Sequence, residues 1–353
     1  MNTSTVHTTP GELMLTEIRE QPDVLARQLD TELQGIRSIA ARLREARPAA
    51  VLLAARGTSD HAALYAKYLI ETTLGLPCGL ASMSTFTAYR AEARYQDTLW
   101  IAISQSGGSP DLIQSTQRAA HGGAITLAIT NSPESPLAAA AQMSISIGAG
   151  IERAVAATKS YTASLQATWL LVDLWSGGDG SAARTLPDHV RWLVDRDDVL
   201  EVSSRYRFAD RLITVGRGFS YPTAREGALK MMETSYVGAQ AFSGADLLHG
   251  PVAMVDAACP VLVVGAAGMT ADLLAPVMER LRERGADICV VGPPSVQAGL
   301  PAAINLLTPE GVDERLAPIV QIIPLQLLAR QMATDRGHDP DQPRGLSKAT
   351  ATR

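Results

Sequence analysis

Cysteine is scarce in this sequence, and the shortage excludes several kinds of site. The three cysteines, Cys78, Cys259 and Cys289, lie in or beside apolar segments and show no CxxC spacing. We therefore expect buried reduced thiols rather than a disulfide framework or a zinc site. The six histidines include no HxxxH pair, so we expect no bound metal. Nothing in the pattern calls for a cofactor.

Long apolar runs and clusters of positive charge are also missing. No apolar stretch approaches the ~18 residues that a membrane helix needs, and the polar N-terminus lacks the pattern of a signal peptide. The formal net charge is -5, and no Lys/Arg cluster offsets it, which argues against a nucleic-acid-binding surface. We therefore expect a cytoplasmic protein that binds neither membranes nor nucleic acids.

The remaining composition is typical of a globular chain. Of its 353 residues, 46% are hydrophobic and 19% are charged, which is enough to build a full core. This length indicates two domains, or one large domain built from two halves.

Strand-like and helix-like segments alternate along most of the chain. Residues 1–10 look disordered, and residues 12–47 have a helical pattern that Pro48 ends. Short apolar runs typical of buried strands follow, separated by helical patterns. Strands are expected at 50–55, 78–81, 99–103, 124–129, 211–215 and 260–264, with helices at 61–73 and 110–120. This alternation predicts a parallel sheet with helices on both faces.

The chain repeats itself at a constant offset. Gly57 and Gly218 are related by this offset (218 − 57 = 161), and so are Gly107 and Gly268 (268 − 107 = 161) in a separate turn. One offset for two turns indicates an internal duplication into two α/β halves. The segment SGGDGSAAR interrupts the helices, and it places the boundary near residues 176–195.

The turn SQSGGSPD, from Ser104 to Asp111, follows the apolar run 99–103 and precedes a helical pattern. Helix N-termini present unpaired N–H groups to anions, and Ser104, Ser106 and Ser109 add hydroxyl donors. The turn lacks Lys and Arg, so a small phosphorylated metabolite fits it better than a nucleotide. A solvated Ser/Gly turn is the alternative. The equivalent residues 265–267 have lost every hydroxyl, and this asymmetry favours an anion site in the first half.

Three ionisable residues of the second half share one helix face. Glu226, Lys230 and Glu233 stand at i, i+4 and i+7. They form either a solvated salt-bridge ladder or a proton-transfer base whose pKa a neighbouring cation tunes.

Two further candidates lie in irregular segments. His249 belongs to a loop-like stretch at 242–251. It is either structural or catalytic, since neutral imidazole suits the ring opening of a sugar. By composition, residues 341–350 read as a frayed tail that exposes Lys348.

Six motifs together resemble the sugar isomerase (SIS) family of phosphosugar-binding domains. In order along residues 12–353 they are RGTSDHAALYAKY, SQSGGSPD, AVAATKSYTASL, GRGFSYPTAREGALKMMETSY, ADLLHGPVAMVD and QPRGLSKAT. They look like the isomerase half of glucosamine-6-phosphate synthase. The resemblance implies an α/β fold of two tandem SIS domains, each a doubly wound, flavodoxin-like parallel sheet. Residues 1–46 would be an N-terminal tail and helix, 47–180 and 196–335 the two domains, and 336–353 an active-site tail.

The resemblance also implies roles for individual residues. Glu233 would move a proton between carbon 1 and carbon 2, with Lys230 and Glu226 on the same face. His249 would assist ring opening in the site of the neighbouring subunit of a homodimer. Lys348 would form an imine with an open-chain ketose or hold the chain over the sugar. The substrate phosphate and hydroxyls would lie against Gly57, Thr58, Ser59, Ser104, Gln105, Ser106, Ser109, Ala157 and Glu226.

The chain departs from the synthase pattern in three respects. Residue 2 is Asn where the glutaminase has its nucleophilic cysteine, Met232 replaces a lysine, and Ala157 replaces a serine. The LLHGPV loop and the C-terminal D-x-P-x-G-L-x-K-x-T are more similar to SIS-type glucosamine-6-phosphate deaminases, which lack the glutaminase.

We therefore expect an amino-sugar-phosphate isomerase/deaminase that converts glucosamine 6-phosphate and water to fructose 6-phosphate and ammonia. One alternative is a related isomerase or deglycase acting on another amino-sugar phosphate. Another is an isomerase/aminotransferase that runs toward glucosamine 6-phosphate. From a different class, a non-catalytic phosphosugar sensor would need the phosphate site but not Glu233, His249 and Lys348 together.

Overall fold

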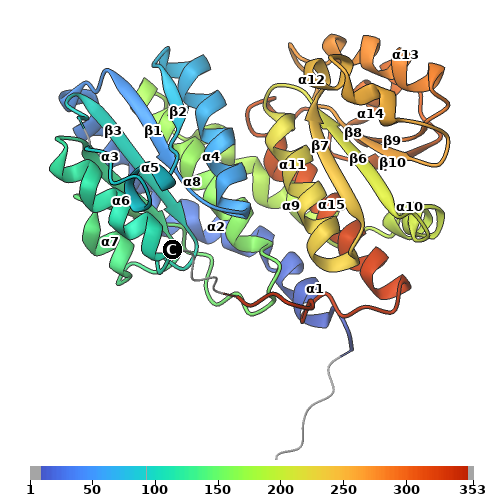
Figure 1. The fold of residues 1–353 in the computed structure, drawn as a ribbon, viewed down its shortest axis with the longest axis horizontal. Helices are drawn as coiled ribbons and strands as arrows, with labels where there is room; N and C mark the ends of the chain where they lie inside the picture. Colours follow the sequence, from blue (N-terminus) through green and yellow to red (C-terminus); the bar gives the residue numbers. More distant parts are fainter. Residues whose placement is uncertain (1–8, 93, 349–353) are drawn as a thin grey trace, which may run out of the picture.

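The chain folds into two α/β units that lie side by side (Figure 1). The computed structural model describes residues 9–92 and 94–348. Most of the segment expected to be disordered, residues 1–8, therefore lies outside the described residues.

Each unit is built on a parallel five-stranded sheet. The first sheet has the order β2 (Cys78–Leu80), β1 (Ala50–Ala54), β3 (Thr98–Ser104), β4 (Ile125–Thr130) and β5 (Met143–Ser146). The second has the order β7 (Gly238–Ser243), β6 (Arg211–Gly216), β8 (Pro260–Val264), β9 (Asp287–Gly292) and β10 (Ile304–Leu307). Equivalent strands occupy equivalent places, so the sheet order confirms the duplication.

The constant offset between the halves also appears in the structure. Strands β5 and β10 begin at positions related by it (304 − 143 = 161), and Gly57 and Gly218 share the same positive φ of 55°. Residues with a side chain rarely adopt this left-handed conformation. Both halves therefore use glycine for the same sharp turn between a strand and a helix.

Helices cover both faces of each sheet, as the alternating pattern predicts (Figure 1). Between the two sheets lie α4 (Thr58–Leu69), α8 (Lys159–Ser176), α11 (Ser220–Lys230) and α15 (Ala317–Asp335). The outer faces carry α5 (Ser84–Thr87), α6 (Pro110–His121) and α7 (Pro136–Ala140) on the first sheet, and α12 (Gly244–Leu248), α13 (Ala275–Glu283) and α14 (Pro294–Gly299) on the second. The remaining helices are α1 (Glu12–Arg19), α2 (Gln21–Thr31), α3 (Leu33–Ala46), α9 (Leu186–Leu193) and α10 (Val199–Tyr206).

Several boundaries differ from the sequence-based expectation. The N-terminal helical region breaks into three helices at Glu20 and Glu32. Helix α4 begins at Thr58 rather than at 61, because its polar first turn places Asp60 where a negative charge stabilises a helix N-terminus. The loop-like stretch before His249 contains the short helix α12, which Ser243 caps by accepting a hydrogen bond from the Asp246 N–H.

The hydrophobic core joins the two units. One cluster of buried residues runs from the inner face of the first sheet through α4, α8, α11 and α15 to the second sheet. Separate clusters lie under the outer helices of each unit. All three cysteines are buried and free, as expected. Because the inner core is continuous, the contact between α4 and α11 is part of the packed interior.

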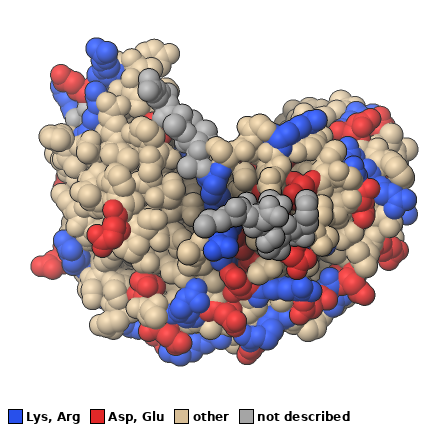
Figure 2. Space-filling view, turned by 90° about the horizontal axis from the view of Figure 1, so that it is seen from below, with Lys and Arg blue, Asp and Glu red and all other residues tan. Residues whose placement is uncertain are grey.

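The surface carries charged residues of both signs (Figure 2), as the nearly balanced numbers of acidic and basic residues predict. On the face shown in Figure 2, acidic and basic side chains are interspersed, and neither sign forms a continuous patch. Within the described ranges, no helix combines the length and the apolar character that crossing a bilayer takes.

Candidate active site

A cavity of about 410 Å³ opens at the carboxyl ends of β1 and β3. In a sheet of this order, β1 and β3 flank the point where the strand order reverses, and such a point is where open α/β sheets bind ligands. The volume falls within the ~300–1,000 Å³ typical of small-molecule sites. The cavity is lined by Arg56, Gly57, Thr58, Ser59, Ser104, Gln105, Ser106, Ser109, Val155, Ala157, Lys230, Glu233, Leu346, Ser347 and Lys348.

One end of the cavity is the serine-rich turn between β3 and α6. Gly107 has φ 62°, and a Cβ there would lie 2.1 Å from the Ser135 hydroxyl oxygen, so only glycine fits. Ser104 accepts a hydrogen bond from the Gly107 N–H at 3.2 Å and so shapes the turn. Ser109 precedes α6 in an extended conformation and makes no side-chain capping bond. Its hydroxyl is therefore available to a ligand at the helix N-terminus.

The equivalent turn of the second half already holds an anion. The Glu314 carboxylate accepts hydrogen bonds from the Met269 N–H at 2.9 Å and the Thr270 N–H at 3.1 Å, and also from the Thr270 hydroxyl. Met269 and Thr270 are the counterparts of Gly108 and Ser109 at the constant offset (270 − 109 = 161). The repeated turn thus binds a carboxylate where its own chain supplies one. In the first half the corresponding turn lines the cavity.

A chain of alternating charges, Glu226, Lys230 and Glu233, reaches the wall of the cavity through Lys230 and Glu233. The Lys230 ammonium lies 3.3 Å from a Glu226 oxygen and 2.5 Å from a Glu233 oxygen. Glu233 stands on the π-helical turn Met231–Ser235 that continues α11, a distortion common at functional sites. The three side chains share one face, as their spacing predicts. Lys230 and Glu226 are fully buried, so they are not a solvated ladder.

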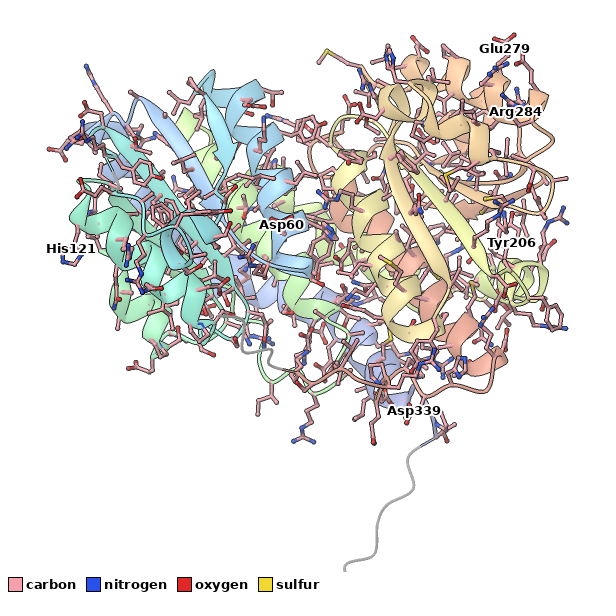
Figure 3. All side chains as sticks on the ribbon, viewed as in Figure 1. Asp60, His121, Tyr206, Glu279, Arg284 and Asp339 are labelled. Carbon is pink, nitrogen blue, oxygen red and sulfur yellow. The ribbon has the colours of Figure 1, made fainter. Side chains whose placement is uncertain are left out.

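The first half holds this chain of charges in place. Thr58 donates to Glu226 at 3.0 Å and accepts from Lys230 at 3.2 Å, and the His61 ring lies 2.7 Å from the other Glu226 oxygen. These contacts cross from α4, the helix that carries Asp60 (Figure 3), to α11. Burial alone would raise the pKa of Glu226, but Lys230 and His61 together hold it below its usual value.

The charge of Lys230 is fixed in the same way. Burial lowers the pKa of a lysine, yet the carboxylates of Glu226 and Glu233 outweigh that effect and raise the pKa of Lys230. The ammonium therefore stays charged beside Glu233, whose side chain reaches the cavity. A carboxylate held beside a permanent cation, at the wall of a water-accessible cavity, is a suitable base for moving a proton on a small substrate.

The C-terminal segment contributes Leu346, Ser347 and Lys348 to the wall of the cavity. After α15 it passes α1 and returns to the first unit (Figure 1). The Asp341 carboxylate accepts hydrogen bonds from the Leu13 and Met14 N–H groups, and the Arg344 N–H donates to the Tyr236 hydroxyl. Lys348 then lines the cavity. The expectation of a frayed tail, which rested on composition alone, is therefore wrong for the segment up to Lys348. Residues 349 and 350 of the predicted tail motif lie outside the described residues.

Lys348 is held by a residue that the sequence did not single out. Its ammonium donates to a Glu152 oxygen at 2.7 Å and to the Ala154 carbonyl at 2.6 Å. Glu152 is fully buried in the loop between β5 and α8, and it also accepts from the Thr158 and Ser160 N–H groups. Burial would raise the pKa of Glu152, but the Lys348 ammonium and the Ser160 bonds keep it below its usual value.

The structure brings together most of the predicted site residues but not all. Gly57, Thr58, Ser59, Ser104, Gln105, Ser106, Ser109, Ala157, Lys230, Glu233 and Lys348 line the cavity. Glu226 lies beneath Lys230 and does not line it. His249 is exposed at the end of α12 and does not line it in this chain.

Sequence reasoning missed two charged residues, Arg56 and Glu152. Arg56 could have been found from the sequence, because it follows the first expected strand, 50–55. The turn after that strand lies beside the serine-rich turn, since the strand order reverses between β1 and β3. Glu152 could not have been found in this way, because an isolated glutamate in a loop gives no sign that it will be buried.

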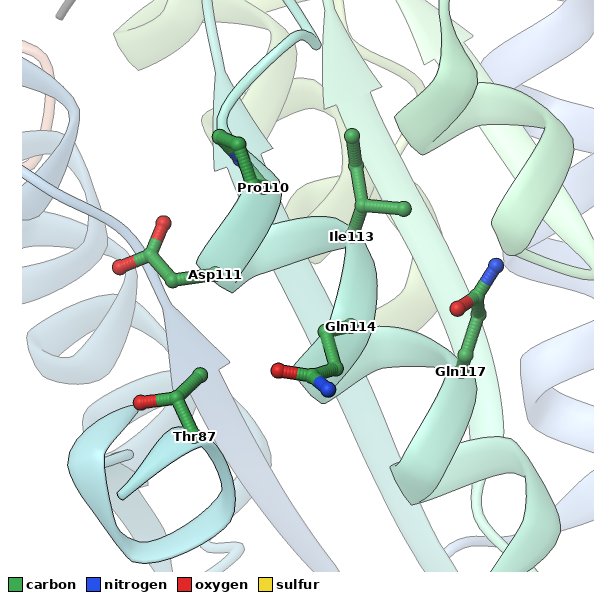
Figure 4. Close-up of a pocket in the computed structure, with 6 residues that line it drawn as sticks. All are labelled: Thr87, Pro110, Asp111, Ile113, Gln114 and Gln117. Carbon is green, nitrogen blue, oxygen red and sulfur yellow. The ribbon is translucent and has the colours of Figure 1, made fainter. Parts of the chain in front are cut away.

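A second hollow does not compete with this site. It has a volume of about 530 Å³ and lies between α5 and α6 (Figure 4). Its lining is Thr87, Pro110, Asp111, Ile113, Gln114 and Gln117. The one ionisable group among these residues, Asp111, is engaged by Arg56 at 3.0 Å. This hollow therefore lacks both a free base and a free cation.

Comparison with known proteins agrees with the fold. The family model of the SIS domain matches residues 43–174 and 206–336, and the chain belongs to the SIS domain family. It is 36% identical over 339 residues to the glutamine–fructose-6-phosphate aminotransferase (isomerizing) of Methanothermobacter thermautotrophicus. That match covers 95% of this chain and 56% of the relative, so the chain spans little more than half the relative's length.

Two solved structures resemble the whole described fold. A Silicibacter pomeroyi DSS-3 protein assigned as a phosphosugar isomerase is 34% identical, with a TM-score of 0.86, 93% of this chain covered and 99% of the other. The C-terminal domain of the Francisella tularensis glucosamine-fructose-6-phosphate aminotransferase is 27% identical, with a TM-score of 0.85, 97% of this chain covered and 100% of the other. Both confirm the paired α/β units of the predicted fold.

Proposed function

We propose that this protein is an amino-sugar-phosphate isomerase/deaminase, acting on glucosamine 6-phosphate and water to give fructose 6-phosphate and ammonia. The observation that carries the proposal is a single cavity lined both by the serine-rich turn and by the Lys230–Glu233 pair. A sensor needs only the first of these. The family membership and the similarity to phosphosugar enzymes support the same class of substrate.

In this proposal the substrate phosphate lies at the N-terminus of α6. It accepts hydrogen bonds from the Gly108 and Ser109 N–H groups and the Ser109 hydroxyl, as Glu314 does in the second half. The phosphate anchors one end of the open-chain sugar, which directs carbons 1 and 2 toward Glu233. Ser59, Ser104, Gln105 and Ser106 complete this end of the cavity.

The proposed reaction is a proton shift followed by hydrolysis. The Glu233 carboxylate removes the proton from carbon 2 of the open-chain aldose and returns it to carbon 1. In the same isomerisation the carbon 1 carbonyl oxygen gains a proton and becomes a hydroxyl, and the carbon 2 amine gives up one proton, so the number of protons is unchanged. The product is an imine at carbon 2. Water adds to this imine, the carbon–nitrogen bond breaks, and ammonia leaves a ketone behind. Lys230 holds Glu233 in place through their ion pair, and Lys348 holds the chain of the sugar.

An ammonia assay on the purified protein tests this proposal. Glucosamine 6-phosphate should release ammonia and fructose 6-phosphate in equal amounts. Galactosamine 6-phosphate and a fructosamine phosphate test the alternative substrates. Release of ammonia from none of these compounds would contradict the proposal.

The second candidate is the reverse reaction, in which ammonia is added to fructose 6-phosphate. It is favoured by the name of the curated relative, an isomerizing aminotransferase. The same proton shift serves both directions. Rates measured with glucosamine 6-phosphate, and with fructose 6-phosphate plus ammonium, decide between them.

A further inference from the structure

Arg56 stands at the phosphate end of the cavity and is held there by a buried carboxylate. It lies two residues after the end of β1 and lines the cavity with Ser59 and Ser109. Its Nε donates to Asp111 at 3.0 Å, and its Nη2 lies 3.0 Å from the same oxygen. The Asp111 side chain is 2% exposed and that of Arg56 is 49% exposed. Asp111 thus fixes the guanidinium while leaving it open to a ligand.

The contact with Asp111 leaves most of the guanidinium donors unused. An arginine has five N–H donors in a planar fork. The Nε and Nη2 edge faces Asp111, and Nη1 has no hydrogen bond within residues 9–92 and 94–348. A planar guanidinium with one edge fixed and another open is well suited to a phosphate oxygen.

The other cations of the cavity are committed elsewhere. Lys230 is fully buried between Glu226 and Glu233. Lys348 donates to Glu152 and to the Ala154 carbonyl. Arg56 is the cation whose neighbours are the serines of the turn.

We propose that Arg56, oriented by Asp111, is a specificity-determining residue that makes the site select a phosphate dianion. This inference rests on the proposed function, because it names the charge that recognises the phosphate of that substrate. The serine hydroxyls and backbone N–H groups bind any small anion, and the guanidinium adds the charge that separates a dianion from a monoanion or a neutral sugar.

The second half of the chain supplies a matched control. The constant offset relates Arg217 to Arg56 (217 − 56 = 161) and Asp272 to Asp111 (272 − 111 = 161). Arg217 forms no ion pair with Asp272 across the described ranges, and the turn beside it is filled by Glu314. The paired arginine occurs in the half that keeps its hydroxyls. Arg217→Gln therefore removes the same charge from the same structural position without touching the cavity.

Isothermal titration with fructose 6-phosphate tests the proposal without turnover. Arg56→Gln should weaken binding about 10- to 100-fold, the usual effect of losing a hydrogen bond to a charged group. Arg217→Gln should bind like the wild type. A phosphate monoester loses its second proton near pH ~6. The wild type should therefore bind more tightly as the pH rises from 5 to 7, and Arg56→Gln should lose most of that dependence.

The double variant Arg56→Gln/Asp111→Asn separates recognition from simple neutralisation of Asp111. If Arg56 only neutralises the buried carboxylate, removing both charges restores wild-type affinity, and the inference is overturned. If Arg56 binds the phosphate, the loss persists in the double variant. Equal binding by Arg56→Gln and the wild type overturns the inference alone. A wild type that binds no fructose 6-phosphate overturns the proposed function as well.

Discussion

The Lys348 ammonium lies 2.7 Å from a carboxylate oxygen of Glu152, although 196 residues separate the two along the chain. Glu152 also receives the Thr158 and Ser160 N–H groups at 3.0 Å each. One buried carboxylate therefore ties the C-terminal segment to the loop that carries Ala157. The Lys348 nitrogen is engaged in this contact, so attack on a carbonyl to form an imine requires that it first leave Glu152.

Glu152→Gln should release the C-terminal segment. The glutamine oxygen can still accept from the two N–H groups, but its amide nitrogen only donates and faces the Lys348 ammonium. Loss of a charge-assisted bond should raise the population of the detached segment about tenfold. Brief trypsin treatment followed by mass spectrometry should show faster cleavage after Arg344, together with lower activity.

Ser160→Ala is the matched control for this experiment. It removes the Ser160 hydroxyl, which donates to Glu152 at 2.7 Å, and leaves the charge pair with Lys348 intact. Cleavage at the wild-type rate is expected for this variant. Equal protection of the segment in Glu152→Gln and the wild type would show that the lysine contact does not hold it.

Glu233→Gln should abolish turnover and spare binding. Glutamine has nearly the same shape but cannot take a proton from carbon 2, and loss of a positioned base costs about 10²–10⁴-fold in rate. Affinity for fructose 6-phosphate, measured by titration, should stay close to that of the wild type. Full activity in this variant would remove Glu233 from the role of base.

Ser109→Ala tests the phosphate end of the cavity. Removing this hydroxyl should raise the KM for glucosamine 6-phosphate about tenfold, with kcat little changed, because the lost bond is made in the ground state and the transition state alike. Thr270→Ala makes the equivalent change in the second half, where Glu314 is the ligand. A higher KM in both variants would indicate a general loss of structure.

Stability should depend on pH through the buried Glu226–Lys230 pair. The folded-state pKa of Glu226 is lowered, so its contribution is present above the unfolded value of about 4.3 and is lost as the pH falls through the folded value. That of Lys230 is raised, so its contribution is present below about 10.4 and is lost as the pH rises further. Between these limits the whole pair stabilises the fold.

Glu226→Gln should remove the loss of stability that the wild type shows as the pH falls. At pH 7 the variant should be less stable by about 3 kcal/mol, because Lys230 loses one partner of a buried ion pair. Urea unfolding at pH 7 and at pH 3.5 gives the free energy of unfolding at pH 7 and its loss on acidification. A wild type and a variant that lose equal stability on acidification would show that the pair does not titrate in this range.

Mixed oligomers test the expectation that His249 serves a neighbouring subunit. Its exposed position at the end of α12, away from the cavity of its own chain, suits that role. Glu233→Gln and His249→Ala chains, each inactive alone, should regain activity when unfolded, mixed and refolded together. One site of the mixed dimer then has both wild-type residues. An inactive mixture, or a monomer in solution, contradicts the shared site.

The regular parts of this fold could be predicted because local pattern and tertiary structure agree. The apolar runs at 99–103 and 260–264 are predicted as strands and are strands in the structure. A parallel strand buried on both faces is a continuous apolar run, which is easy to recognise in a sequence. The duplication was visible because turns such as Gly57 and Gly218 require glycine in each half. The face shared by Glu226, Lys230 and Glu233 followed from helix geometry alone.

The parts that could not be predicted depend on contacts between distant segments. Glu152 and Glu314 have no local pattern around them, and their partners Lys348 and Thr270 lie 196 and 44 residues away. Lys348 looked like an exposed tail residue because nothing nearby marks a segment that crosses the molecule. Such contacts form only once both units are packed, so they leave no periodicity in the sequence.

Glu314 makes two like halves unequal in what they can hold. Its carboxylate acts as a permanent intramolecular competitor at the second turn, where a Cβ on Gly268 would lie 2.2 Å from its oxygen. No concentration of free ligand dilutes a group tethered to the same chain. The repeated fold should therefore saturate at one sugar phosphate per chain. The turn of the second half instead holds Glu314, and with it the segment that leads into α15.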